Sequence, residues 1–109
     1  MQTIRLQPIP HQTLKCRIDD QYFGIALYQK NGQIFADVAR AGEWLVRMVP
    51  CLRLVPIVCR EYAGMRGQFL FVDTEGSADP DDYSGLGTRW QLLYLDADEY
   101  AAVRELHLQ

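Results

Sequence analysis

Alternation of apolar and polar residues dominates the first half of the chain, and this period of two is typical of β-strands with one buried face. Four segments show it. They are Thr13–Ile18, Tyr22–Lys30, Gln33–Arg40 and Glu43–Val49, the last with Trp44, Val46 and Met48 on one face and Leu45 and Val49 on the other.

Short turn sequences separate these four segments. Asn31-Gly32 lies between two alternating segments, and both residue types tolerate the positive φ angles of a type I′ hairpin turn. Asp19-Asp20 and Ala41-Gly42 lie at the other two junctions. Because each connection is tight, we expect the four strands to pair in sequence order as an antiparallel meander.

The middle of the chain is less regular. Pro50 and Pro56 cannot donate to a sheet ladder, so they favour an edge, a bulge or a strand start. We therefore expect Leu52–Glu61 to be an irregular or edge strand that crosses from one sheet to another. Further along, the sequence predicts a turn at Gly64–Gly67, a strand at Gln68–Asp73, a loop at Thr74–Gly87 and a strand at Thr88–Leu95, with Trp90, Leu92 and Tyr94 on one face and Leu93 and Leu95 on the other.

The period changes near the C-terminus. Asp96 is followed three residues later by Glu99, which is the spacing of a capping box at the start of a helix. Apolar residues then recur at helical intervals at Tyr100, Val103 and Leu106. The pattern predicts a short helix from about Ala97 to Leu106.

Together these elements predict an all-β, mainly antiparallel fold: a small barrel or sandwich built from a meander, with one short C-terminal helix, in a single β-rich domain over residues 1–109. Several strands carry apolar residues on both faces, such as Tyr22, Ala26 and Tyr28 opposite Phe23, Ile25 and Leu27. A sandwich buries one face of a sheet. The apolar residues on the other face are explained either by a partner chain that covers them or as hydrophobic side chains scattered over the surface.

Composition and charge exclude some classes of binding partner. The 109 residues carry a net charge of −3, and the 11 lysines and arginines are scattered, which argues against nucleic acid. The most apolar segment, Trp44–Cys59, is shorter than the about 20 residues that span a bilayer and contains Arg47 and Arg53. Met1–Gln12 lacks the apolar run of an export signal. We expect a soluble protein that binds neither nucleic acid nor membrane.

The residues that usually carry chemistry form no recognisable site. Cys16, Cys51 and Cys59 lie in apolar stretches and are interpreted as buried thiols in a reducing compartment. His11 and His107 lie near opposite ends of the chain and adjoin no Cys- or Ser-bearing motif. The spacings typical of zinc, calcium and phosphate sites are missing. The sequence thus predicts no enzyme, no cofactor and no metal.

Five carboxylates nevertheless cluster within ten residues, at Asp73, Glu75, Asp79, Asp81 and Asp82. Their spacing matches no cation cage, so a solvated loop rich in turn formers is the favoured interpretation. Docking onto a basic partner surface is an alternative, and cation binding by residues 73–82 is left open. Trp44 and Trp90 alternate with aliphatic residues, which favours core or interface anchors over a ligand-stacking site.

Two segments of the sequence resemble a known protein family. The first is Ile4–Leu14, where an apolar-x-apolar-x-x-Pro element precedes Gln12 and a hydrophobic strand. The second is Gly67–Gly87, with Phe69-Leu70-Phe71, Asp79-Pro80, Tyr83 and Leu86-Gly87 ahead of the strand Arg89–Tyr94. Together they resemble the baseplate plug family of small tail proteins from contractile-tailed bacteriophages. The sequence departs at Asp20, where the family pattern has glycine, and this affects only the geometry of that turn.

The resemblance implies a virion structural protein at the central hub of the tail baseplate, near the junction of tube, hub and spike. Its partners would be other tail proteins (hub, tube, spike or tape measure) in an oligomeric context, and its location the virion tail after assembly in the host cytoplasm. The resemblance implies no catalysis and no cofactor. The candidate partner-interface residues are Ile4, Leu6, Pro8, Pro10, Trp44, Asp79, Asp81, Asp82 and Tyr83.

A second hypothesis is a small β-barrel binding module for a ligand, peptide or sugar, with Trp44, Trp90 and the acidic loop forming its site. Such a site requires a preformed pocket in a stable monomer. A plug-like component is instead expected to have an N-terminal arm or acidic loop that becomes ordered against its neighbours.

Overall fold

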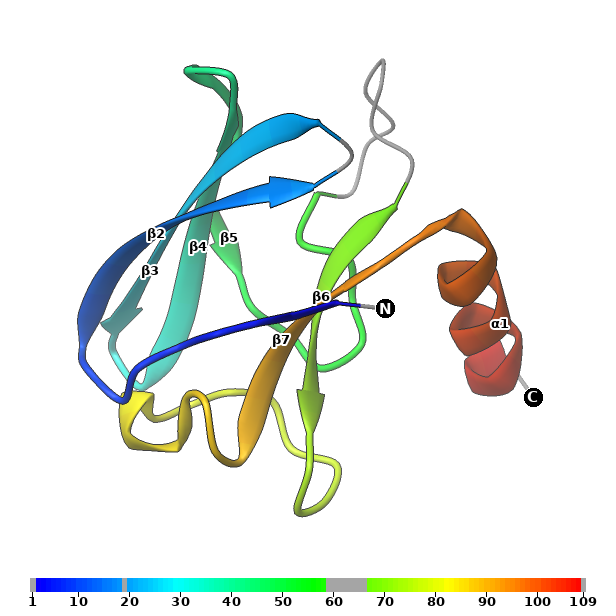
Figure 1. The fold of residues 1–109 in the computed structure, drawn as a ribbon. Coiled ribbons are helices and arrows are strands. Elements are labelled where there is room, and N and C mark those ends of the chain that lie inside the picture. Colours follow the sequence, from blue (N-terminus) through cyan, green and yellow to red (C-terminus); the bar gives the residue numbers. More distant parts are fainter. Residues whose placement is uncertain (1, 19, 59–66, 109) are drawn as a thin grey trace.

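The computed structural model describes residues 2–18, 20–58 and 67–108. Two antiparallel sheets face each other (Figure 1). One has the spatial order β2 (His11–Ile18), β3 (Gln21–Lys30), β4 (Gln33–Arg40), β5 (Glu43–Pro50), and the other the order β1 (Gln2–Ile4), β7 (Trp90–Leu95), β6 (Gln68–Asp73). The sheets do not close into a barrel, so the sandwich is the one of the two predicted alternatives that is found.

The four-stranded sheet is the meander that the alternation predicts. Asn31 (φ 54°) and Gly32 (φ 74°) connect β3 to β4, and Ala41 (φ 51°) and Gly42 (φ 83°) connect β4 to β5. Positive φ at both central residues is the type I′ pattern, whose twist matches that of the strands. Asp20 also has a positive φ of 63°, an angle that glycine adopts freely. Asp19 lies outside the described residues.

The core fills the space between the sheets. Trp90, Leu92 and Tyr94 of β7, which were predicted to share one face, are buried there together. Phe69 of β6 joins the two layers, because its ring centroid lies 5.2 Å from that of Phe23 on β3 and 5.1 Å from that of Tyr94. Edge-to-face contacts of this kind add to the burial of apolar surface.

The N-terminal segment is part of this core. β1 pairs with β7, with Ile4 opposite Leu92, a long-range pairing that the alternation did not reveal. The side chains of Ile4 and Leu6 are buried between the sheets. The arm is therefore packed against its own chain as far as Leu6.

The middle of the chain runs beside β6 without forming a regular strand. Arg53 makes an isolated bridge to Phe71, and the amides of Leu54 and Ile57 donate to the carbonyls of Phe71 and Phe69. The irregular form predicted for Leu52–Glu61 is thus found over residues 52–58. Its remainder, and most of the predicted turn at Gly64–Gly67, lie outside the described residues. In the loop that follows β6, Tyr83–Gly85 forms a short 3-10 turn, η1.

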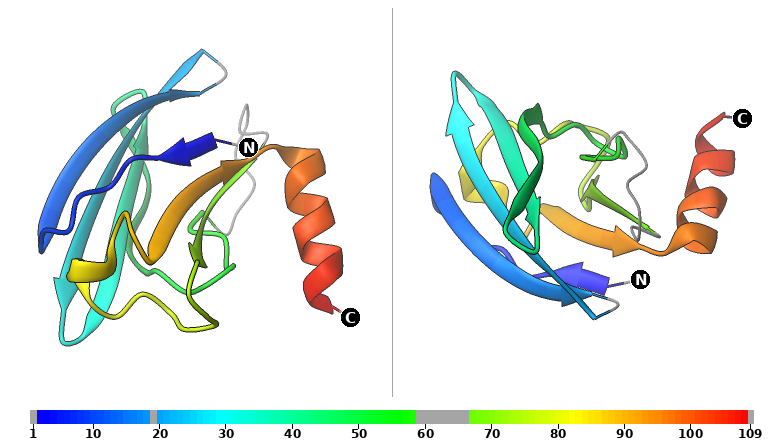
Figure 2. Two further views of the ribbon diagram at one scale, coloured as in Figure 1. Left: turned by 60° about the horizontal axis from the view of Figure 1, so that its bottom comes forward. Right: turned by 90° about the horizontal axis from the view of Figure 1, so that it is seen from above.

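The helix α1 (Ala97–Leu108) follows β7 and lies on the side of the three-stranded sheet that faces away from the other sheet (Figure 2). Its capping box is confirmed, because the Asp96 amide donates to Glu99 Oε1 (3.1 Å) and the Glu99 amide to Asp96 Oδ1 (2.8 Å). Tyr100 packs against a small apolar cluster of Leu70, Leu93 and Leu95. No helix in the described part of the chain is long and apolar enough to cross a membrane.

β5 departs from the alternation predicted for it. Two register shifts separate it from β4 between Ala36 and Ala39, so that β5 holds extra residues relative to its neighbour. Each extra residue changes which side chains face the core. The predicted common face of Trp44, Val46 and Met48 is therefore wrong, since Trp44 and Met48 are exposed and the core is contacted by Leu45, Val46 and Val49.

Candidate interaction surface

The N-terminal arm divides into a buried and an exposed part. Beyond the buried Leu6, the chain forms a turn closed by two hydrogen bonds between Gln7 and Gln12, the Gln7 amide donating to Oε1 (3.1 Å) and Nε2 donating to the Gln7 carbonyl (2.6 Å). Pro8 and Pro10 are exposed on this turn. Of the arm residues predicted to contact a partner, the prolines are accessible, whereas Ile4 and Leu6 are already covered by the core.

Asp73, at the start of the acidic loop, serves an internal role. Its carboxylate is fully covered and accepts two hydrogen bonds from the Arg89 guanidinium, at 2.9 and 3.0 Å. The amides of Glu75 and Ala78 donate to the same carboxylate. The Arg89 hydrogen bonds, followed by these backbone donors, hold the pKa of Asp73 far below its usual range against the opposing effect of burial. This carboxylate fixes the loop rather than facing a partner.

The other acidic residues of the loop differ in whether their carboxylates already accept hydrogen bonds within the chain. Asp79 accepts a hydrogen bond from the Arg53 amide (2.8 Å), and Asp82 caps η1 by accepting from the Ser84 amide (3.0 Å). Tyr83, half-buried, donates its amide to Gln29 Oε1 (2.7 Å) and so ties the loop to β3. Asp81 is exposed. Among the described residues no group of three or more His, Cys, Asp or Glu could hold a metal ion.

The surface of the β2–β5 sheet that faces away from the core, here called the outer face, carries exposed aromatic and basic side chains. Tyr22 is 63% exposed and Trp44 54%. The Arg17 guanidinium lies 5.5 Å from the Tyr22 ring centroid, and that of Arg47 lies 4.8 Å from the Trp44 ring. Cation–π contact keeps such arginines near the ring. Arg17 also donates from Nη2 to Asp20 Oδ1 (2.9 Å). Trp44 was among the predicted interface residues, whereas Tyr22 and the two arginines were not.

The exposed cluster on β5 is held by a buried carboxylate. Asp37 of β4 accepts hydrogen bonds from the Met48 amide (2.7 Å) and from the Tyr28 hydroxyl (3.1 Å). Met48 itself has φ of 54°, an uncommon angle for this residue type. Burial, and then the bond to Asp37, raise the pKa of the Tyr28 hydroxyl, which therefore stays protonated as a donor. We call Trp44, Arg47 and Met48 the knob.

A shallow depression lies on the same outer face beside the knob, with a volume of about 360 Å³. We call it the hollow. Gly24, one of the residues that line it, pairs with Ala39, which in turn pairs with Trp44. A Cβ added at Gly24 would meet no atom within 4 Å, so the glycine leaves the space open. The hollow is lined by Lys15, Tyr22, Phe23, Gly24, Ala39, Ala41 and Gly42.

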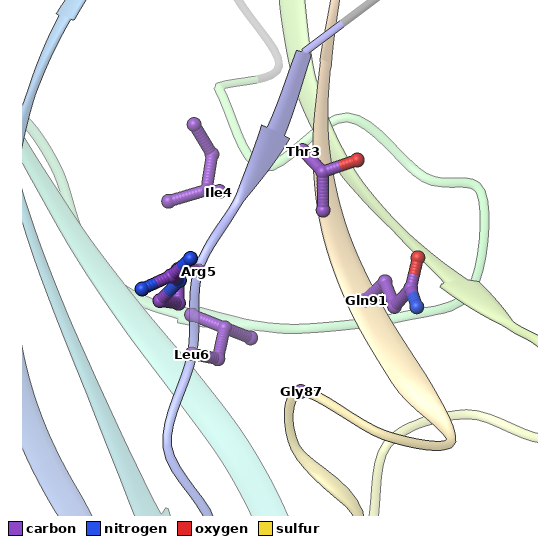
Figure 3. A pocket seen from close by; sticks show the side chains of 6 residues that line it. All are labelled: Thr3, Ile4, Arg5, Leu6, Gly87 and Gln91. Atoms are coloured by element: carbon purple, nitrogen blue, oxygen red, sulfur yellow. The ribbon is translucent and has the colours of Figure 1, made fainter.

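A second depression, of about 270 Å³, lies where β1 leaves β7. Figure 3 shows Thr3 and Gln91 over β7, with Ile4 and Arg5 on the other side of the β1 ribbon. Gly87 closes it from below, and a Cβ there would meet the Leu6 carbonyl oxygen at 2.5 Å. Its lining includes one charged residue, Arg5, and lacks the paired acid and base that catalysis requires.

The remaining candidate residues do not meet. Trp90 is buried in the core and donates its indole N–H to the Ala78 carbonyl (3.2 Å), whereas Trp44 is on the opposite side of the four-stranded sheet. The ligand site imagined between them is therefore not formed. Cys51 is buried, and burial raises the pKa of its thiol to about 12. Cys16 is only half-buried, and Cys59 and the side chain of His107 lie outside the described part.

Comparison with known proteins gives one family. The sequence profile described as "Cyanophage baseplate Pam3 plug gp18" matches residues 1–98. The match spans both sheets and the acidic loop and ends at the start of α1. A search of curated proteins gives no match. The family supports a structural role in a phage baseplate, and hence a place in the virion tail among other baseplate proteins. Because the match covers most of its length, the chain belongs to the cyanophage baseplate plug family.

Proposed function

We propose that this chain is a structural component of the central hub of a phage tail baseplate, positioned where tube, hub and spike meet. The family match over residues 1–98 carries the proposal, because it covers the whole sandwich rather than one motif. In this role the chain binds its neighbours, performs no catalysis and needs no cofactor. It assembles in the host cytoplasm before the tail is complete.

The outer face and the exposed turns supply surfaces suited to such binding. Trp44 and Tyr22 with their covering arginines have the side chains that most often dominate the energy of protein interfaces. Asp81 is exposed on the acidic loop and can steer a basic partner surface. We therefore propose that the partner interface uses the exposed members of the predicted set: Pro8, Pro10, Trp44, Asp79, Asp81, Asp82 and the half-buried Tyr83.

The arm residues Ile4 and Leu6 act indirectly in this proposal. Their burial fixes β1 against β7 and so positions the exposed Pro8–Pro10 turn. An interface on a prearranged turn loses less conformational entropy on binding than one on a disordered arm.

Copurification tests this role. The tagged chain is expressed together with the genes that neighbour its own, and captured proteins are identified and quantified by mass spectrometry. We expect tube, hub or spike proteins in fixed stoichiometry, and a loss of that capture in Trp44→Ala or Asp81→Lys. Val55→Ala serves as control, because Val55 is exposed on a different segment. A folded chain that captures none of these proteins would contradict the proposal.

A further inference from the structure

The strand β2 is the outermost strand of the four-stranded sheet and has a hydrogen-bonded neighbour on one side only, β3 (Figure 2). In an antiparallel sheet, successive residues direct their backbone N–H and C=O groups alternately to one side and to the other. The Pro10 carbonyl accepts a hydrogen bond from the Gln29 amide of β3, so by this alternation the even-numbered residues of β2 face β3. The backbone groups that face away belong to His11, Thr13, Lys15 and Arg17. We call these groups the β2 edge.

No hydrogen bond or bridge within the described part of the chain uses the β2 edge. The other sheet edges differ. Leu54 and Ile57 cover β6 through their amides, β1 has only three residues, and β5 contains bulges and ends at Pro50. Covering segments, short strands, bulges and proline are the usual means by which proteins prevent an edge from pairing. By contrast, β2 runs for eight residues in unbroken register with β3 and contains no proline.

The core side of β2 is suited to an added strand with apolar residues at every second position. Leu14 and Cys16 pack against the core on this side, yet both are only partly buried. A strand added at the β2 edge would place every second side chain of its own beside these two residues. Apolar residues at those positions would complete the cover of the core.

The outer side of β2 is basic. Lys15 and Arg17 are exposed there, and no acidic residue lies in β2. Arg17 pairs with Asp20 (2.9 Å), whereas Lys15 makes no ion pair among the described residues. Opposite charges on facing residues of neighbouring strands attract each other, and like charges repel. Acidic residues at the remaining positions of an added strand would therefore complement this side.

A second copy of β2 does not complement this edge. Two identical β2 strands pair antiparallel only with odd-numbered residues opposite odd-numbered ones, because these carry the outward backbone groups. Registers that place Lys15 opposite itself, Thr13 or Arg17 all gather the lysine and arginine of both copies on one face. The like charges disfavour this pairing while leaving the edge open to an acidic strand.

We propose that the β2 edge binds an extended strand of a different chain, in which acidic residues alternate with apolar ones, and so adds a strand to the four-stranded sheet. The acidic side chains lie beside Lys15 and Arg17, and the apolar ones cover Leu14 and Cys16. Backbone hydrogen bonds provide affinity and the two rows of side chains provide selectivity, as in other complexes formed by strand addition. This surface differs from the residues assigned to the partner interface above, and strand binding does not require the baseplate role.

Peptide binding to the full chain tests the edge. The probe is a fluorescently labelled synthetic peptide of eight residues, the length of β2, in which glutamate alternates with valine, and binding is measured by fluorescence anisotropy. A matched peptide has lysine in place of glutamate and should bind about tenfold more weakly or worse. Only every second amide of an added strand faces β2, so N-methylation of one alternate set of peptide amides should abolish binding, and that of the other set should not.

Variants of β2 separate the backbone from the charge. Thr13→Pro removes an outward N–H without removing a hydrogen bond to β3 or a charge, so it should weaken binding of the glutamate peptide about tenfold. Thr13→Val keeps the N–H and is the matched control. Lys15→Glu should shift the preference toward the lysine peptide. Circular dichroism checks that each variant is folded.

Hydrogen exchange followed by NMR locates the bound strand. The amides of Thr13, Lys15 and Arg17 should exchange quickly in the free chain and more slowly with the glutamate peptide bound. The inference is overturned if neither peptide binds, if both bind equally, or if the two methylation patterns have the same effect. A chain that captures tail proteins but binds neither peptide would overturn strand binding alone. Peptide binding without capture of tail proteins would overturn the baseplate role alone.

Discussion

At the residue scale, single side chains and backbone angles decide where the chain turns and what holds its loops. The turn at Asn31-Gly32 could be predicted from the sequence, because both residue types favour the positive φ angles that it requires. The pairing of Asp73 with Arg89 was not, because sixteen residues separate them and nothing local marks Arg89 as a partner. The sequence of the acidic cluster therefore favoured a solvated loop, although its first carboxylate, that of Asp73, is covered and accepts hydrogen bonds from within the chain.

Ala41 allows a direct test of the turn geometry. Its φ of 51° is unfavourable for alanine, so Ala41→Gly should raise the free energy of unfolding by about 0.5–1 kcal/mol once the greater freedom of glycine in the unfolded chain is counted. Ala39→Gly, inside β4, should instead lower it by about 0.5–1 kcal/mol. Urea unfolding followed by circular dichroism measures both. Equal losses in the two variants would contradict the turn assignment.

Asp73 should make stability depend on pH. Because its pKa is lowered in the folded state, its contribution is fully present above the unfolded value of about 3.9 and is lost as the pH falls through and below that value. Asp73→Asn should therefore be less stable than the unaltered chain at pH 7, and the difference should shrink as the pH falls below about 4. Thermal unfolding at several pH values measures this. A difference independent of pH would count against the ion pair.

At the element scale, strands follow the alternation closely except where a long-range contact intervenes. β3, β4, β6 and β7 occupy nearly the predicted residues. In β5 the apolar pattern is equally compatible with a flat strand, so the sequence offers no local sign of the bulges. One of them contains Met48, whose amide donates to Asp37, a residue eleven positions earlier and on another strand. A bulge fixed by a neighbour's side chain cannot be read from the strand that contains it.

Removing that carboxylate should release the β5 bulge. Asp37→Ala leaves the Met48 amide and the Tyr28 hydroxyl without their acceptor and should cost about 1–3 kcal/mol. Asp37→Asn keeps an acceptor oxygen and should lose less. Hydrogen exchange at the Met48 amide reports the change locally, with faster exchange expected in Asp37→Ala. Unchanged exchange would show that other contacts hold the bulge.

At the scale of the whole molecule, two sheets share one core and leave their outer sides for other partners. The periodicities predicted an all-β fold with a terminal helix but left barrel and sandwich as alternatives. The pairing of β1 with β7 joins opposite ends of the chain and has no local signal. For the same reason the sequence placed Ile4 and Leu6 at an interface when they lie in the core. Of the apolar residues that the alternation places on the outer face of β3, Tyr22 is exposed.

Truncating Phe69, which packs between the two sheets, should destabilise the fold more than truncating an aromatic residue on the outer face. Phe69 is fully buried against Phe23 and Tyr94, so Phe69→Ala should cost about 3–5 kcal/mol. Phe35, half-buried and stacked on Tyr28 at the outer face, should cost clearly less on the same truncation. Chemical denaturation compares the two. Similar losses would mean that the sheets are not held together mainly at Phe69.

The baseplate role is tested most directly by locating the chain in assembled particles. A small epitope tag after Gln109 is introduced into the phage genome that encodes the chain, and gold-labelled antibody against the tag is imaged on disrupted tails by electron microscopy. The account predicts label at the baseplate end of the tail, at the central axis, in every labelled particle. Label along the tube or on the capsid, or a chain absent from purified virions, would contradict it.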